Sequence, residues 1–393
     1  MAGAKDRLTI RVYADFNKTV QNDDLSHLWT YLVFSTGLHG GFKDLRMSVP
    51  MPLSLSWLWL QREGAVGRHY NHIEVADATD VVWEGRVADI GLRINRSFVG
   101  IDITGFGYYS SLRDRYYDPD DAGNTNWKIG GPHNTGKIIR EMITSVATAI
   151  NGTVDIELSP EDVVGIDLTD RSYPMDIIVD KLAPLAGTGT AVYYFSVYGT
   201  RKPVWTARTV SNVDWQVRLE DMSDLSLVQQ GMHLRNYVMP VVGTAEGATA
   251  INTASTALYP RREILLKLQT GVPTTAANNA RDAMLQERKD PRQNQSFTVK
   301  GHIYSTKAGN LPQGTGSALE EKPKWWVRAG DVIRIQDLVP DSAATGTLDN
   351  LRTFYILETQ YNAGQDTLLV QPDQPASRLG DILARLGTLE KQR

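Results

Sequence analysis

The sequence predicts a mainly β protein of the α+β class, in which two similar β units are separated by an inserted α+β segment. Short runs of alternating apolar and polar residues, typical of half-buried strands, fill the beginning of the chain. The order of features in residues 81–115 returns in residues 354–386, as expected of an internal repeat. Between these segments, from Asn134, the apolar residues change to helical spacing.

The segment 81–115 is expected to form a β-hairpin with one buried face. Its strands, 87–94 and 99–103, carry apolar residues at a period of two. Gly105 and Gly107 follow, and two glycines permit a close backbone turn that side chains would block. The later segment repeats the order of strand, tight turn, strand, corner and leucine-containing stretch.

Further strands are predicted before the hairpin. The alternating stretches lie at 8–14, 32–36, 46–49 and 70–75. The apolar run 51–60 is too short for a bilayer, which needs about 20 residues. It is expected to be a strand or the start of a helix, and to bury Trp57 and Trp59.

The inserted segment is predicted to hold two helices. The first begins at the N-cap Thr135 and ends before Gly152. The second covers 170–186, with Ser172 as its cap and Pro174 in its first turn. Strands are expected after it at 191–198 and 203–206.

Strands and loops alternate in the remainder of the chain. An irregular surface segment is expected at 243–261, which is rich in Gly, Thr and Ala, and a helix at 276–289. Residues 309–322 are expected to form a loop. The predicted strands lie at 225–242, 262–269, 295–304 and from 332 onward.

These patterns divide the chain into domains. The expected domains are a first β-barrel at 1–116, an α+β domain at 117–223, a second β-barrel with long loops and a helix at 224–375, and a C-terminal tail at 376–393. The first boundary lies in a stretch where prolines, glycines and short polar residues accumulate.

Charge and composition exclude several classes of function. A net charge of -4 argues against a protein that wraps nucleic acid by neutralising phosphates. The absence of cysteine excludes disulfides, thiolate metal sites and cysteine nucleophiles. The N-terminal residues lack the apolar region of a signal peptide, so we expect synthesis in the cytoplasm and no stable membrane insertion.

Two stretches match a ligand-binding motif only in part. Residues 131–138 fit GxxxxGK, but Ile138 stands where a phosphate-binding loop needs a hydroxyl residue. The acidic residues from Asp118 to Gly123 match the start of a calcium loop, but Ile129 occupies the place of its bidentate carboxylate. A solvated acidic turn is the favoured interpretation there, and a weak ion site between Asp118 and Gly123 stays open.

No catalytic, cofactor-binding or metal-ligating residue is predicted. His69 and His72 lie near Glu74, but two residues three apart in the strand 70–75 project to opposite faces, which defeats chelation. No GxSxG, HExxH or strand-to-helix GxGxxG motif is present, and no cofactor is implied. The aromatic residues are spread over all the strands, which favours packing over a sugar-binding platform.

The order of motifs resembles the tail-hub, or baseplate-hub, proteins of tailed bacteriophages. The resemblance rests on the hairpin WEGRV…IDITGFGYYSSLRD, the helix SYPMDIIVDKLA and the closing segment WWVRAGDVIRIQDL…FYILETQYN…LLVQPDQP. It covers nearly the whole chain in order. The turn and strand RAGDVIRI and the corner GFGYYSSL carry most of it.

The resemblance implies a structural virion protein with two tail-tube-like β-barrels and an inserted α+β domain. Such proteins form a homotrimer whose barrels make a pseudo-sixfold ring at the tail tip, assembled in the host cytoplasm. Its partners would be the tail tube protein, the tape-measure protein and distal tail, tip or fibre proteins. Genome DNA would pass through the lumen without specific binding, which suits a mildly acidic chain. No enzyme is expected, because the chain stops at Arg393 without the hydrolase extension that some members carry.

Two other classes of function stay open at this point. A carbohydrate-binding or receptor-binding tail module would use the aromatic-rich β domains. A hydrolase of cell-wall material is the least favoured, because no acid and base pair can be named.

Overall fold

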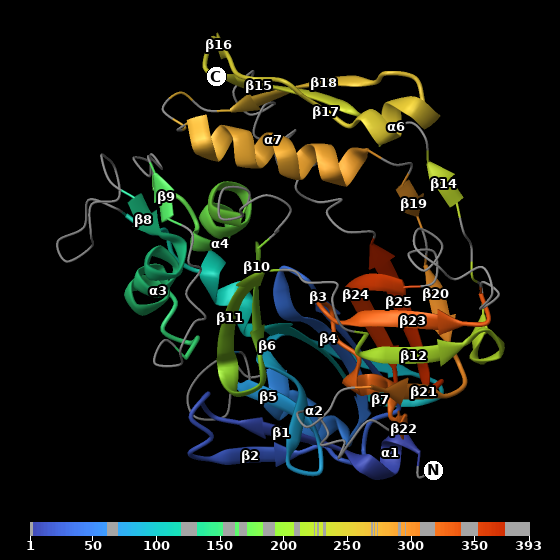
Figure 1. Cartoon of the computed structure of the whole chain (residues 1–393). Helices are drawn as coiled ribbons and strands as arrows, with labels where there is room; N and C mark the ends of the chain where they lie inside the picture. Colours follow the sequence, from blue (N-terminus) through green and yellow to red (C-terminus); the bar gives the residue numbers. More distant parts are fainter. Residues whose placement is uncertain are drawn as a thin grey trace.

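A computed structural model of the chain shows the mainly β architecture of the α+β class that the sequence predicts (Figure 1). Curved sheets fill the lower part of the view, an α+β segment lies to one side, and a small sheet with a long helix lies at the top. The structure describes residues 3–60, 70–118, 132–151, 162–164, 171–183, 193–207, 213–223, 225, 228–230, 233–268, 270, 272, 274–289, 292–294, 296–306, 319–338 and 353–373.

The first β unit contains the predicted hairpin as β6 and β7, paired antiparallel from Gly85 and Gly107 to Asn95 and Phe98. Its strands pair in the order β3-β4-β7-β6-β5-β1-β2, all antiparallel. The elements are α1 (Ala4–Arg7), β1 (Leu8–Tyr13), β2 (Gln21–Asp24), β3 (Tyr31–Gly37), β4 (Gly40–Pro50), α2 (Leu53–Leu60), β5 (His72–Asp77), β6 (Asp80–Asn95) and β7 (Phe98–Gly107).

The α+β segment follows β7 and has a core of its own, in which helix α3 packs against strands β10 and β11. The elements are η2 (Tyr108–Arg113), β8 (Pro132–Asn134), α3 (Thr135–Val146), β9 (Asp162–Val164), α4 (Pro174–Asp176), the π-helix η3 (Ile177–Leu182), β10 (Tyr193–Tyr198), η4 (Gly199–Arg201) and β11 (Lys202–Ala207). Two helix starts differ from the prediction. Thr135 is the first residue of α3 rather than its cap, and Tyr173, not Ser172, precedes α4, where no side chain caps the helix.

The second β unit uses strands from both sides of a long insertion. Its elements are β12 (Trp215–Arg218), η5 (Leu219–Asp221), β13 (Met222–Ser223), β14 (Val228–Gln230), β19 (Arg292–Asn294), β20 (Phe297–Val299), β21 (Ile303–Ser305), β22 (Glu320–Lys322), η7 (Lys324–Trp326), β23 (Val332–Gln336), β24 (Thr353–Asn362) and β25 (Thr367–Asp373). The strand pairings assign β12 and β13 to this unit. Both strands precede residue 224, where the sequence predicts that the second unit begins. The domain boundaries themselves remain predictions.

The insertion forms the small sheet at the top of Figure 1, with helix α7 against one face. Strand β15 lies at its centre and pairs with β16, β17 and β18. The elements are β15 (Tyr237–Val242), β16 (Ala245–Glu246), β17 (Ala250–Ile251), α6 (Thr253–Leu258), β18 (Glu263–Leu268) and α7 (Thr274–Arg288). The helix predicted at 276–289 is confirmed, whereas the irregular segment predicted at 243–261 is wrong, because it contains β16, β17 and α6.

The two β units share one strand order. The first pairs as β3-β4-β7-β6-β5-β1 and the second as β13-β20-β25-β24-β23-β12, and in both units these strands follow one another along the chain in the same succession. One direction differs, since β1 is antiparallel to β5 while β12 is parallel to β23. The internal repeat therefore extends well beyond the hairpins that reveal it in the sequence. The pairings of the described strands do not close either unit into a complete barrel, so barrel closure remains a prediction.

The matching hairpins carry a β-bulge at the same place. The register between β6 and β7 shifts at Ala88, and the register between β24 and β25 shifts at Leu357. A bulge adds one residue to one strand and changes the local twist, so its position fixes how two hairpins align. Alignment at the bulges makes residues 89–93 of β6 the counterpart of residues 358–362 of β24.

Single hydrogen bonds next to the bulges also correspond. Tyr70 N donates to Val87 O over 2.8 Å in the first unit, and Gly330 N donates to Ile356 O over 2.9 Å in the second. Both donors have positive φ, 63° at Tyr70 and 96° at Gly330. A left-handed residue at the same point of both units is a detail that two unrelated sheets would seldom share.

Strand β24 joins the two units. Its first residues pair with β23, and residues 358–362 pair with β3 of the first unit. At this joint the hydroxyls of Thr36 and Thr359 are 2.7 Å apart and buried. The rings of Phe34 and Tyr361 pack with centroids 5.4 Å apart, so the two units share a continuous apolar core.

Helix α2 corrects a prediction of burial. Trp59 is buried as expected, but Trp57 is 55% exposed and the prediction for it was wrong. Apart from Ser54 and Ser56 the helix is apolar, and Ser56 is buried, so the sequence gives no polar face that would mark Trp57 as exposed. Among the described helices, none combines the length and the apolar composition that a bilayer crossing requires.

Candidate functional site

One strand edge of the first unit has no partner among the described strands, whereas its counterpart in the second unit is paired. Strand β3 covers residues 358–362 of β24. The matching residues of β6, 89–93, have β7 on one edge, and no described strand pairs with their other edge. Such an edge presents backbone N–H and C=O groups that can bond a strand from another chain.

Strand β14 has a second edge with which no described strand pairs. Strands β13 and β14 take the place of β3, and β20 and β19 take the place of β4, because β13 pairs with β20 and β14 with β19. The end of β3 pairs with β24, whereas β14 pairs with β19 alone among the described strands. Among the described residues, one strand pairing joins the two units, and the edges of β6 and β14 that would form a second, matching pairing have no partner.

Exposed apolar side chains lie on helix α2 and at the tip of the β6–β7 hairpin. Helix α2 packs against β6 and β7, and Met51 N donates to Val99 O over 3.1 Å. At the tip of the hairpin, Ile94 is 58% exposed. We call the exposed set the edge patch: Leu53, Leu55, Trp57, Leu58, Ile94 and Val99. Large apolar side chains gathered on one surface are typical of protein interfaces.

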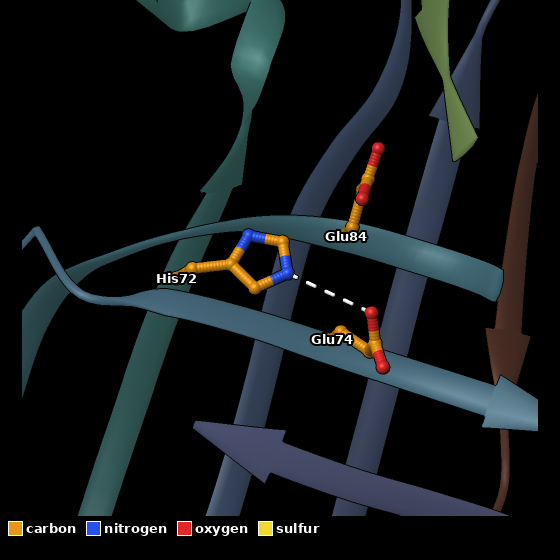
Figure 2. Close-up of side chains that lie close together, drawn as sticks. All are labelled: His72, Glu74 and Glu84. Carbon is orange, nitrogen blue, oxygen red and sulfur yellow. Dashed lines mark ion pairs between the residues drawn. The ribbon is translucent and has the colours of Figure 1, made fainter. Parts of the chain in front are cut away.

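A buried cluster of one histidine and two glutamates lies inside the first unit (Figure 2). His72 and Glu74 come from β5, and Glu84 lies directly opposite Glu74 on β6. His72 Nε2 is 3.7 Å from Glu74 Oε2. One ligand atom from each residue lies within 4.8 Å of the other two. These donor types are those that bind divalent metal ions.

Neighbouring side chains orient two members of the cluster. The hydroxyl of Tyr108 is 2.7 Å from His72 Nδ1, and the ammonium of Lys18 forms an ion pair with Glu74. Burial holds the pKa of His72 below its usual value, although Glu74 opposes this effect. Burial acts to raise the pKa of Glu74, but its interactions with His72 and with the Lys18 ammonium outweigh burial and hold that pKa below its usual range.

Only one carboxylate oxygen of Glu84 has a hydrogen-bond partner among the described residues. The backbone N–H of Arg201, a left-handed residue at the turn between β10 and β11, donates to Glu84 Oε1. Glu84 Oε2 and His72 Nε2 are buried and have no hydrogen-bond partner among the described residues. Burial raises the pKa of the Glu84 carboxyl to about 7, because a charge is costly in a medium of low dielectric constant.

The second unit shows that the fold does not require this cluster. Its residues at the matching positions are Val332, Arg334 and Thr353. Arg334 and Thr353 are a cross-strand pair, like Glu74 and Glu84. The buried histidine and glutamates are therefore a property of the first unit alone.

The sequence analysis named His72 and Glu74 but missed Glu84. It compared His72 only with His69, which lies outside the described residues. The signal that could have found Glu84 is the register of the tight hairpin between β5 and β6, which places Glu74 and Glu84 face to face.

The other partial motifs are placed as follows. Arg171 Nε donates to Asp118 Oδ2 over 2.6 Å, and the rest of the acidic stretch to Gly123 lies outside the described residues. Ile138 of the GxxxxGK match is fully buried in helix α3. The expectation that the chain has no catalytic or cofactor-binding residue remains a prediction.

Comparison with known proteins shows similarity in structure only. No protein-family model and no curated protein matches the sequence. The 43 kDa tail protein of prophage MuSo2 from Shewanella oneidensis has a TM-score of 0.57 at 13% identity, over 96% of this chain and 98% of that chain. The tail protein from Neisseria meningitidis MC58 gives 0.61 at 9% identity, again over 96% and 98%. The prophage tail protein gp18 from Listeria monocytogenes EGD-e gives 0.55 at 13% identity, over 98% and 99%. The chain thus has the fold of these tail proteins over 96–98% of its length.

Proposed function

We propose that the chain is a structural protein of a bacteriophage-type tail and forms the trimeric hub at the distal end of the tail tube. The observation that carries this proposal is the edge of β6 with which no described strand pairs, at the place where β3 covers β24 in the other unit. The fold shared with three tail proteins, two of them from prophages, over nearly their whole length supports it.

The ring follows from repeating the contact that already exists within the chain. In this arrangement β14 of one copy pairs with residues 89–93 of β6 in the next copy, as β3 pairs with β24. The contact is head-to-tail, so cyclic closure satisfies every edge, whereas failure to close would give open fibres. Three chains with two units each would give the pseudo-sixfold ring that the resemblance to tail hubs implies. The edge patch would be buried at each joint.

The partners of such a ring follow from its place in a tail. One face would bind the sixfold tail tube protein and the opposite face distal tip or fibre proteins, with the tape-measure protein and then genome DNA passing through the lumen. The chain would be assembled in the host cytoplasm and reside in the virion. A net charge of -4 suits a channel along which DNA slides without being held.

A proline on the unpaired edge is expected to dissociate the ring. Ala363 N donates to Leu32 O at the joint, and backbone groups alternate between the two edges of a strand, so Tyr361 also faces β3. Its counterpart on β6 is Leu92, whose N–H therefore faces the unpaired edge. The substitution Leu92→Pro removes that N–H and keeps the bonds to β7, and we expect at least a tenfold weaker association.

Light scattering and negative-stain images of the full chain measure this effect. The unsubstituted chain should give a trimeric ring, Leu92→Pro a monomer of 43.7 kDa, and the control Leu92→Ala, which keeps the N–H, a ring. If the unsubstituted chain stays monomeric both alone and with its tail tube protein, the hub proposal is wrong. Glycan affinity of that monomer would then favour the carbohydrate-binding or receptor-binding alternative.

A further inference from the structure

We propose that His72, Glu74 and Glu84 bind a divalent transition-metal ion of the zinc or manganese class inside the first unit. The set offers an imidazole nitrogen and two carboxylates, and one ligand atom from each lies within 4.8 Å of the others. An ion bound at about 2.0–2.2 Å from each ligand fits a triangle of this size after small side-chain rotations.

The orientation of His72 supports this assignment. Metal-binding histidines usually engage a hydrogen-bond partner with the ring nitrogen that does not touch the metal. Here Tyr108 OH lies 2.7 Å from Nδ1, and its ring stacks on the imidazole with centroids 5.7 Å apart. The other nitrogen, Nε2, points toward Glu74 in Figure 2.

Two buried atoms of the cluster have no hydrogen-bond partner among the described residues. The side chain of His72 is fully buried and Glu84 is 1% exposed, yet Nε2 of the first and Oε2 of the second accept no described hydrogen bond. A buried polar atom without a partner costs about 1–3 kcal/mol, so native proteins seldom keep one without a reason. A single cation would satisfy both atoms.

A bound metal ion would replace the ammonium of Lys18 as the positive charge beside Glu74. The ammonium of Lys18 is the cation that neutralises Glu74 in this structure. Lys18 lies on the turn between β1 and β2 and its side chain is one-third exposed, so the ammonium can move into solvent when a divalent ion binds the carboxylates. Lys18 should therefore compete with the metal ion.

The chemistry of the donors limits the class of metal. Ca²⁺ takes six to eight oxygen ligands, and Mg²⁺ keeps most of its waters, so neither suits one imidazole and two carboxylates in a buried site. Zn²⁺ and Mn²⁺ accept mixed nitrogen and oxygen ligands, with water in a remaining position. The site lies within one chain, so it does not depend on whether the ring forms.

Metal titration of the full-length chain tests the proposal. After removal of metals with a chelator, we expect calorimetry with Zn²⁺ or Mn²⁺, and elemental analysis after gel filtration, to give one ion per chain and a rise in Tm of a few degrees. Glu84→Gln should abolish binding. Tyr108→Phe should weaken it by about 10–100-fold through loss of the bond to His72. Lys18→Ala should strengthen it, because the competing ammonium is gone.

The control is Glu246→Gln, which removes an exposed carboxylate of the small sheet and should leave binding unchanged. Near-UV circular dichroism establishes that each variant is folded. The absence of saturable binding by the unsubstituted chain overturns the proposal. Binding that is equal in the unsubstituted chain, Tyr108→Phe and Lys18→Ala also overturns it, since the ion then lies elsewhere, and this comparison decides the matter even if Glu84→Gln does not fold.

Discussion

The substitution Asp77→Ala is expected to lower the free energy of unfolding by about 3–5 kcal/mol, because it leaves buried donors without their acceptor. Asp77 ends β5, and its Oδ2 accepts hydrogen bonds from Trp325 Nε1 at 3.0 Å and Trp326 Nε1 at 3.2 Å. The same oxygen is 2.7 Å from a guanidinium nitrogen of Arg7. One carboxylate of the first unit thus holds two buried indoles of the second unit.

Urea denaturation followed by tryptophan fluorescence measures this loss. Asp77→Asn keeps one acceptor oxygen, so we expect a smaller decrease than for alanine. The matched control is Glu220→Ala, which removes an exposed carboxylate paired with Arg218 and should change the free energy of unfolding by less than about 1 kcal/mol. A decrease for Asp77→Ala no larger than that of the control would mean that the indoles find other acceptors.

Local patterns explain what could be predicted from the sequence. The hairpins β6–β7 and β24–β25 were predictable because each strand buries one face against a single core, which imposes a period of two. Helix α7 was predictable for the same reason, since Ala280 and Met284 repeat at helical spacing and are buried against the small sheet. In both cases the apolar residues whose spacing predicts the strand or helix are the same residues that pack in the core.

Features that depend on distant neighbours could not be predicted in this way. Glu84 joins His72 and Glu74 only through the pairing of β5 with β6, which a scan along the chain does not see. Trp57 and Trp59 are equally apolar, and only the packing of α2 on the hairpin decides that Trp57 stays exposed. Gly105 and Gly107 lie at the end of strand β7, not in the close turn that their sequence suggests.

The position of Gly107 in a strand leads to a further prediction. Glycine is required at this position because a neighbouring strand lies too close for a side chain, and not because the chain turns. Its φ of -58° and ψ of 160° are open to alanine. A Cβ at this position, however, would lie 1.8 Å from the carbonyl oxygen of Phe42 on β4. The clashing oxygen belongs to the backbone, so no side-chain rotation relieves the clash. Strands β4 and β7 must therefore move apart.

We therefore expect Gly107→Ala to lower the free energy of unfolding by about 3 kcal/mol, the upper part of the range for overpacked cores. The control is Gly91→Ala in the same hairpin, where the nearest atom to an added Cβ is Asp102 O at 3.9 Å and a change within about 0.5 kcal/mol is expected. Urea denaturation of both variants gives the comparison. Equal values would show that β4 and β7 can part at little cost, whereas a large difference would show that the close contact of their backbones, and not a turn, is the reason for glycine at residue 107.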